Sequence, residues 1–123
     1  MVDDRHAYGQ TGETAAVAFL ESRGYTILER NFRTRFAEID IIARHKGVLV
    51  FVEVKARRSR RHGDPKWAVT PTKQRKISMA ALTWLKRHGG TQVRARFDVV
   101  TVQQLGGRTQ VELIPNAFEL AYA

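Results

Sequence analysis

The sequence contains no cysteine and no long run of apolar residues. Without thiols it has no disulfide, no thiolate nucleophile and no cysteine-bound zinc. No apolar stretch reaches the roughly 20 residues that a membrane-spanning helix needs. The N-terminus carries Asp3 and Asp4 instead of the apolar core of a signal peptide. We therefore expect no membrane association and, by default, a cytoplasmic location.

Acidic residues are also scarce, with 12 Asp and Glu against 21 Lys and Arg, for a net charge of +9. Residues 57–76 hold eight basic side chains and one acid, a local charge of +7. The eight are Arg57, Arg58, Arg60, Arg61, Lys66, Lys73, Arg75 and Lys76. This charge predicts a polyanionic partner, most often nucleic acid, although a solvated basic loop is the alternative. The basic segment is not accompanied by a basic amphipathic helix with an aromatic face, so a membrane surface is the less favoured partner.

The 123 residues, 43% of them hydrophobic, predict a single domain over 1–123. We expect helices over 10–23 and 70–88, and strands over 25–32, 94–102 and 109–114, with a hairpin over 38–55. Residues 1–9 are expected to form a loose arm, 56–69 a loop and 116–123 a tail. The predicted fold class is α/β, a mixed sheet flanked by helices in the order α-β-β-β-α-β-β. The crossover through the second helix predicts a parallel strand pair.

The hairpin over 38–55 is the most informative stretch. Lys46-Gly47 suits a two-residue turn, and the apolar run that follows predicts a central strand. With this turn, Asp40 falls opposite Glu53, and directly opposed residues have Cβ atoms about 4.5–5.5 Å apart. Lys55 shares the face of Glu53, because side chains alternate along a strand.

Two opposed carboxylates repel each other unless one is protonated or a cation lies between them. Asp40 and Glu53, with Lys55 beside them, therefore predict a site for a divalent metal. Oxygen ligands alone suit Mg²⁺ or Mn²⁺. The alternative is a sheet end with solvated charges and a simple Glu53–Lys55 pair.

Each predicted helix carries one polar residue on the face that is expected to pack against the core. Glu13 lies on the apolar face of the first helix, where it either complements the helix dipole or points to the acidic cluster. Gln74 lies on the inward side of the second helix, together with Ile77 and Ala81. Asp98, within a predicted strand, could be structural.

Several short motifs of the sequence resemble those of one family. They are Gly12-Glu13, Gly24-Tyr25, Asn31-Phe32-Arg33, Glu38-Ile39-Asp40, Phe51-Val52-Glu53-Val54-Lys55 and Arg96-Phe97-Asp98-Val99-Val100. Over roughly residues 8–103 the chain resembles the small bacterial YraN-like family of the PD-(D/E)XK nuclease superfamily, which is related to archaeal Holliday-junction resolvases. The chain departs from the superfamily pattern at Ile39, where a proline usually precedes the aspartate.

The resemblance implies a restriction-endonuclease-like fold and metal-dependent phosphodiester hydrolysis. Asp40 and Glu53 would hold Mg²⁺ or Mn²⁺, and Glu13 would add an outer ligand through water. Lys55 would orient the attacking water or stabilise charge on the phosphate. Gln74 would also belong to the catalytic set.

Three functions remain open from the sequence: a DNA nuclease, possibly acting on branched or repair intermediates; a nucleic-acid-binding module that does not cleave; and a basic protein that binds an acidic partner. The opposed carboxylates favour the nuclease, since a module that does not cleave has no evident need for them. Junction resolution would require two active sites and hence a homodimer.

Overall fold

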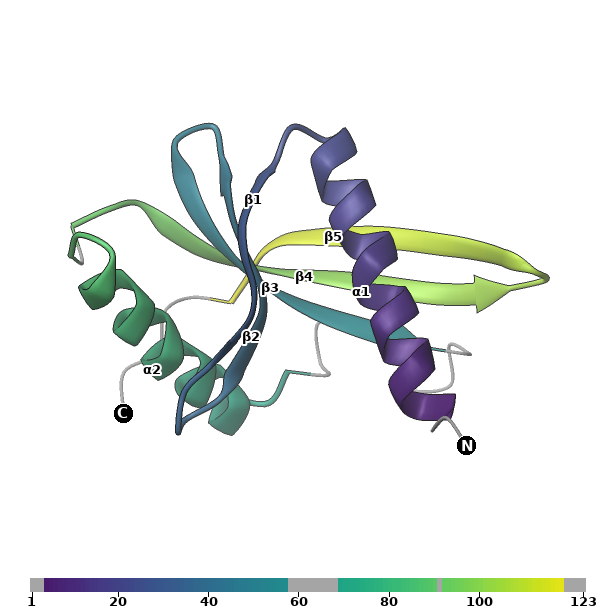
Figure 1. Cartoon of the computed structure of the whole chain (residues 1–123), viewed down its shortest axis with the longest axis horizontal. Coiled ribbons are helices and arrows are strands. Elements are labelled where there is room, and N and C mark those ends of the chain that lie inside the picture. Colours follow the sequence, from purple (N-terminus) through teal and green to yellow (C-terminus); the bar gives the residue numbers. More distant parts are fainter. Residues whose placement is uncertain (1–3, 58–68, 91, 119–123) are drawn as a thin grey trace.

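The computed structural model describes residues 4–57, 69–90 and 92–118, and it has the predicted order of elements (Figure 1). Two helices and five strands follow one another along the chain. They are α1 (Asp4–Ser22), β1 (Thr26–Arg33), β2 (Glu38–His45), β3 (Val48–Arg57), α2 (Pro71–Arg87), β4 (Ala95–Leu105) and β5 (Arg108–Phe118).

The five strands form one mixed sheet in the order β1-β2-β3-β4-β5. The pair β3–β4 is parallel and the other three pairs are antiparallel. Because α2 connects the parallel strands, the predicted crossover is confirmed. The predicted α/β fold class and the central position of β3 are confirmed with it.

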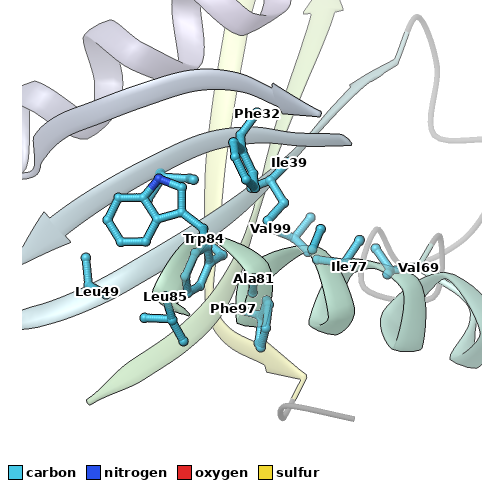
Figure 2. Close-up of a cluster of buried hydrophobic side chains, with 13 residues drawn as sticks. Phe32, Ile39, Leu49, Val69, Ile77, Ala81, Trp84, Leu85, Phe97 and Val99 are labelled. Atoms are coloured by element: carbon cyan, nitrogen blue, oxygen red, sulfur yellow. The ribbon is translucent and has the colours of Figure 1, made fainter. Parts of the chain in front are cut away.

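Each face of the sheet is covered by one helix. Ala16 and Leu20 of α1 pack with Val50 and Val52 of β3 on one face. On the other face, α2 packs against the sheet through an apolar stripe of Ile77, Ala81, Trp84 and Leu85 (Figure 2). The indole N–H of Trp84 donates to Glu29 Oε1 at 3.1 Å, so its polar atom is satisfied within the protein. Within the described residues, no helix is long and apolar enough to cross a membrane.

Both ends of the chain differ from the prediction. Helix α1 begins at Asp4, so residues 4–9 are not a loose arm and neither Gln10 nor Thr11 caps the helix. The stretch contains no proline, and an acid at its start suits the positive end of the helix dipole. Residues 1–3 and 119–123 lie outside the described part of the chain.

At the C-terminal end, β5 continues to Phe118 instead of ending at Ile114, so residues 116–118 are strand and not tail. The register of β4 with β5 shifts between Phe97 and Val99, and Asn116 has a φ of 51°. An edge strand accommodates such an irregularity, because only one side of it is paired.

Asp98 holds this irregularity in place and is fully buried. Its carboxylate accepts hydrogen bonds from the backbone N–H of Asn116 at 2.8 Å and from Arg96 Nε at 3.0 Å. It also accepts one from the Tyr25 hydroxyl at 3.1 Å. These contacts show the structural role that the sequence left open for Asp98.

Replacing Asp98 with Ala should destabilise the fold by about 3–5 kcal/mol, because Arg96 would lose its buried ionic partner. Asp98→Asn keeps an acceptor for Asn116 and should cost less. The measurement is urea unfolding followed by circular dichroism. A midpoint for Asp98→Ala equal to that of the wild type would contradict this role.

Candidate active site

The register of β2 and β3 brings two carboxylates together. Pairing runs from His45 opposite Val48 to Ile41 opposite Val52, as predicted. The turn has a φ of 50° at Lys46 and 77° at Gly47, as a type I′ hairpin requires. One step further, the same register places Asp40 beside Glu53.

Beyond the last paired residues of β2 and β3, a backbone N–H of β3 donates to the Asp40 side chain instead of to a backbone carbonyl of β2. Asp40 Oδ2 accepts this hydrogen bond from the N–H of Val54 at 2.8 Å. By alternation along their strands, Asp40 and Glu53 point to the sheet face of Ile42 and Phe51, which α2 covers. The side chain of Asp40 is therefore held in one position by the strand beside it.

The environment of Asp40 favours its neutral form. Burial, followed by the negative charge of Glu53, raises the pKa of Asp40 from 3.8 to about 7. The hydrogen bond from Val54 acts in the opposite direction but is outweighed, and the more distant charges of Glu13 and Glu38 add to the increase. The predicted repulsion between the two carboxylates is thus present in the structure, and a cation placed between them would relieve it.

Two lysines compensate the buried carboxylate of Glu53. Lys73 Nζ from α2 lies 2.8 Å from Glu53 Oε1, and Lys55 Nζ from β3 lies 3.5 Å from the same oxygen. Burial and the neighbouring ammonium of Lys73 lower the pKa of Lys55. Burial also disfavours the charge of Lys73, but the hydrogen bond to Glu53 outweighs it and raises the pKa of Lys73. Lys73 is therefore the closer counter-ion, and Lys55 is the more easily deprotonated amine.

An open cleft of about 540 Å³ lies over the carboxylates, between the β1–β2 turn and the start of α2. Thr70 caps α2 and accepts from the N–H of Lys73, and Pro71 follows at the first position, as predicted. The helix therefore directs its positive N-terminal end to the cleft. The cleft is lined by Phe36, Ala37, Glu38, Asp40, Glu53, Thr70, Thr72, Lys73 and Lys76.

Glu13 is held away from the carboxylate pair. Its Oε1 accepts from Arg30 at 3.2 Å, an ion pair between α1 and β1 on the opposite face of the sheet. Gly12 permits the close approach of α1, since a Cβ there would lie 3.0 Å from the Cβ of Ala56. Among the side chains that the structure describes, no three His, Asp or Glu converge on one possible metal position. Glu38 also lines the cleft but is paired with Arg33 at 3.1 Å, which leaves Asp40 and Glu53 as the two candidate ligands there.

Gln74 lies beside the cleft, but its side-chain amide is engaged elsewhere. Its Nε2 donates to the carbonyl of Val69 at 2.9 Å, which ties the segment before α2 to the first turn of the helix. This contact accounts for its inward position and leaves it outside the set of residues that line the cleft.

The structure places part of the predicted basic surface at the cleft. Lys73 and Lys76 line it, and Arg75 is exposed with its guanidinium 3.3 Å from Thr72 Oγ1. The other predicted side chains, those of Arg57, Arg58, Arg60, Arg61 and Lys66, lie outside what the structure describes.

Sequence reasoning missed two features of the site. It assigned Lys73 to nucleic-acid binding alone, although the Thr70-Pro71 start already placed this lysine in the first turn of the helix. It also gave no role to Phe36, which lines the cleft from the turn before β2. The signal in the sequence was an aromatic residue that follows Arg35 and lies just before β2, the strand that carries Glu38 and Asp40.

Comparison with known proteins assigns the chain to a family. The family model described as "Uncharacterised protein family UPF0102" matches residues 12–102, which include both carboxylates and both lysines. The chain belongs to the UPF0102 family. This membership confirms the YraN-like resemblance of the sequence.

Curated UPF0102 proteins are similar to this chain over nearly its full length. Proteins of Geobacter metallireducens, Pelobacter propionicus and Desulfosudis oleivorans are each 55% identical to it. The matches cover 93%, 97% and 97% of this chain, and 93%, 87% and 95% of the three relatives. Each relative is described only as a UPF0102 protein, so these names assign no reaction.

The raised pKa of Asp40 predicts a specific dependence of stability on pH. Its proton stabilises the fold fully below pH 3.8, and this contribution is lost as pH rises through about 7. Asp40→Asn cannot titrate and should escape the loss. Its stability relative to the wild type should therefore increase between these pH values, by up to about 1.4 kcal/mol per unit. Urea unfolding in EDTA at several pH values measures the difference, and a constant difference would contradict the assignment.

Proposed function

We propose that this UPF0102 protein is a divalent-metal-dependent endonuclease that hydrolyses phosphodiester bonds in DNA. The observation that carries the proposal is the pair of half-buried Asp40 and buried Glu53, held in an open cleft with Lys55 and Lys73 beside it. The net charge of +9 supports a polyanionic substrate. A cytoplasmic location, and a homodimer for cutting two strands of a branched DNA, belong to the same proposal.

The residues of the cleft fit a magnesium or manganese ion. Mg²⁺ in proteins commonly takes one or two carboxylates and completes its coordination with water and substrate phosphate. Asp40 and Glu53 would supply the two carboxylates, and a cation between them would relieve the burial and the repulsion that raise the pKa of Asp40. Glu13 would contribute only through water, since Arg30 already binds its carboxylate. When bound, the ion would polarise the phosphate and lower the pKa of the attacking water.

The surrounding lysines would have separate tasks in the hydrolysis. Lys73 and Lys76, near the N-terminal end of α2, would hold the phosphate oxygens. Lys55, an ammonium 3.5 Å from Glu53, would orient the attacking water or stabilise charge on the phosphate, and the proton of that water would pass to solvent. The water oxygen forms the new bond to phosphorus while the bond to the leaving sugar oxygen breaks, and that oxygen is protonated by solvent.

One observation favours a second function, a nucleic-acid-binding module that does not cleave. Lys73 lies only 2.8 Å from Glu53 Oε1, so the charge of Glu53 is compensated without a metal. In such a module Asp40, with a pKa of about 7, would carry its proton in part of the molecules at neutral pH. Metal binding and cleavage, measured together, separate the two functions.

The test is to incubate the protein with linear, single-stranded, flapped and four-way DNA in Mg²⁺, Mn²⁺ or EDTA. We expect cleavage only with metal, and none from a folded Asp40→Asn/Glu53→Gln protein. This double variant should also lose the Mn²⁺ binding that calorimetry detects in the wild type. Unchanged Mn²⁺ affinity would remove these carboxylates from the site. Mn²⁺ binding without cleavage of any DNA would favour the module.

The two lysines on Glu53 should respond differently to replacement by Met. Lys55→Met should reduce cleavage about 10²–10³-fold, as expected for loss of one preorganised group, while metal and DNA binding persist. Lys73→Met should bind Mn²⁺ more tightly, because the nearest competing cation on Glu53 is removed, and DNA more weakly. Lys76→Met is the control, since this exposed lysine should affect DNA binding alone.

Melting temperatures of all three lysine variants show whether each is folded. Wild-type cleavage by a folded Lys55→Met protein would exclude Lys55 from catalysis. Equal Mn²⁺ affinities for Lys73→Met and wild type would show that Lys73 does not compete for the carboxylate.

A further inference from the structure

Phe36 is an aromatic side chain that the hydrophobic core does not use. It is half-buried and belongs to neither of the two clusters that join the helices to the sheet. It lines the same cleft as Asp40 and Glu53. Its position therefore has to be explained by the cleft and not by packing of the core.

The turn that carries Phe36 is well ordered by hydrogen bonds. The backbone N–H of Thr34 donates to the carbonyl of Ala37 at 3.0 Å, closing the turn. The hydroxyl of Thr34 accepts from the N–H of Phe36 at 3.0 Å and from that of Ala37 at 3.3 Å. Ala37 packs against the cluster under α2, which anchors the turn to the core. Phe36 is thus held at the rim of the cleft before any ligand binds.

One cation lies over this aromatic ring, and its cleft holds both lysines and carboxylates. The guanidinium of Arg35 lies 4.9 Å from the centre of the Phe36 ring, and Lys73 and Lys76 line the same cleft from α2. An aromatic face among cations is the combination that binds single-stranded nucleic acid, where bases stack on rings and cations follow the backbone. A volume of about 540 Å³ lies within the range of sites for small ligands, sufficient for one nucleotide.

We propose that Phe36, backed by Arg35, is a stacking platform for an unpaired base next to the phosphate that Lys73 and Lys76 would hold in the cleft. This inference rests on the proposed nuclease function and names its substrate class. A continuous duplex keeps its bases stacked on one another and has no free face to offer. The preferred substrate is therefore DNA with an unpaired nucleotide at the cleavage position, in a single strand, a flap or a branch point.

The chain offers a matched control on the other face of the sheet. Phe19 of α1 is also half-buried, lies outside both clusters and carries a guanidinium, that of Arg23, 4.6 Å from its ring centre. It is not among the residues that line the cleft. Phe19→Ala therefore removes an equivalent cation–π pair without touching the proposed platform.

The experiment measures binding by fluorescence anisotropy in EDTA, so that neither metal nor cleavage is required. A single strand and a duplex of equal length are compared. Phe36→Ala and Phe36→Leu should weaken binding of the single strand about 5- to 150-fold, the effect of losing one base–aromatic stack. Their duplex affinity should stay close to that of the wild type. Phe36→Tyr retains an aromatic face and should bind like the wild type, as should Phe19→Ala.

A second readout places the base on the ring. A 2-aminopurine within the single strand should change its fluorescence on binding to wild type and to Phe36→Tyr, but not to Phe36→Leu.

Melting temperatures confirm that each variant is folded. Equal losses for single strand and duplex, or wild-type binding by Phe36→Leu, would overturn the platform and leave the proposed nuclease standing. Selective loss with Phe36→Leu, together with no cleavage by the wild type, would support the platform and reject the nuclease. Failure of the wild type to bind any DNA would reject both.

Discussion

The antiparallel register of β2 and β3 is the constraint on which the candidate site depends. The type I′ turn at Lys46-Gly47 sets this register, and apolar side chains on both faces of β3 maintain it. A slip of one residue would move Asp40 to the other face of the sheet and bury it under α1. The turn at one end of the hairpin thus determines which carboxylates meet at the other end.

Bringing like charges together is unfavourable, and the surrounding residues lessen the cost in different ways. Val54 donates its N–H to Asp40, and Lys73 and Lys55 approach Glu53. The two carboxylates are compensated unequally, because both ammonium groups lie at Glu53 while the pKa of Asp40 rises to about 7. This imbalance supports the proposed cation, and the burial of Glu53 distinguishes the site from a sheet end with solvated charges.

The cleft also depends on how α2 packs against the sheet. Its apolar stripe packs in one cluster with Phe51, Ile42 and Phe97 of the sheet. Figure 2 shows Trp84, Leu85 and Phe97 of this cluster. The first turn, beginning at Thr70, then brings Lys73 to Glu53. The β1–β2 turn closes the opposite side with Phe36. The hydrophobic packing that stabilises the fold therefore also positions the polar groups that would meet a substrate.

The sequence by itself determined the order of the elements, the hairpin register and the Asp40–Glu53 pair. These follow from local patterns, because alternation and turn type act between residues close in the chain. The start of α1 at Asp4 and the extension of β5 to Phe118 were not predicted, since end signals are weak and Asp98 holds the β5 irregularity from another strand. The partners of the polar side chains were decided only by the tertiary structure. Glu13 binds Arg30, Lys73 reaches Glu53 and Phe36 stays at the cleft because packing sets the distances between separate elements, and no local pattern encodes those distances.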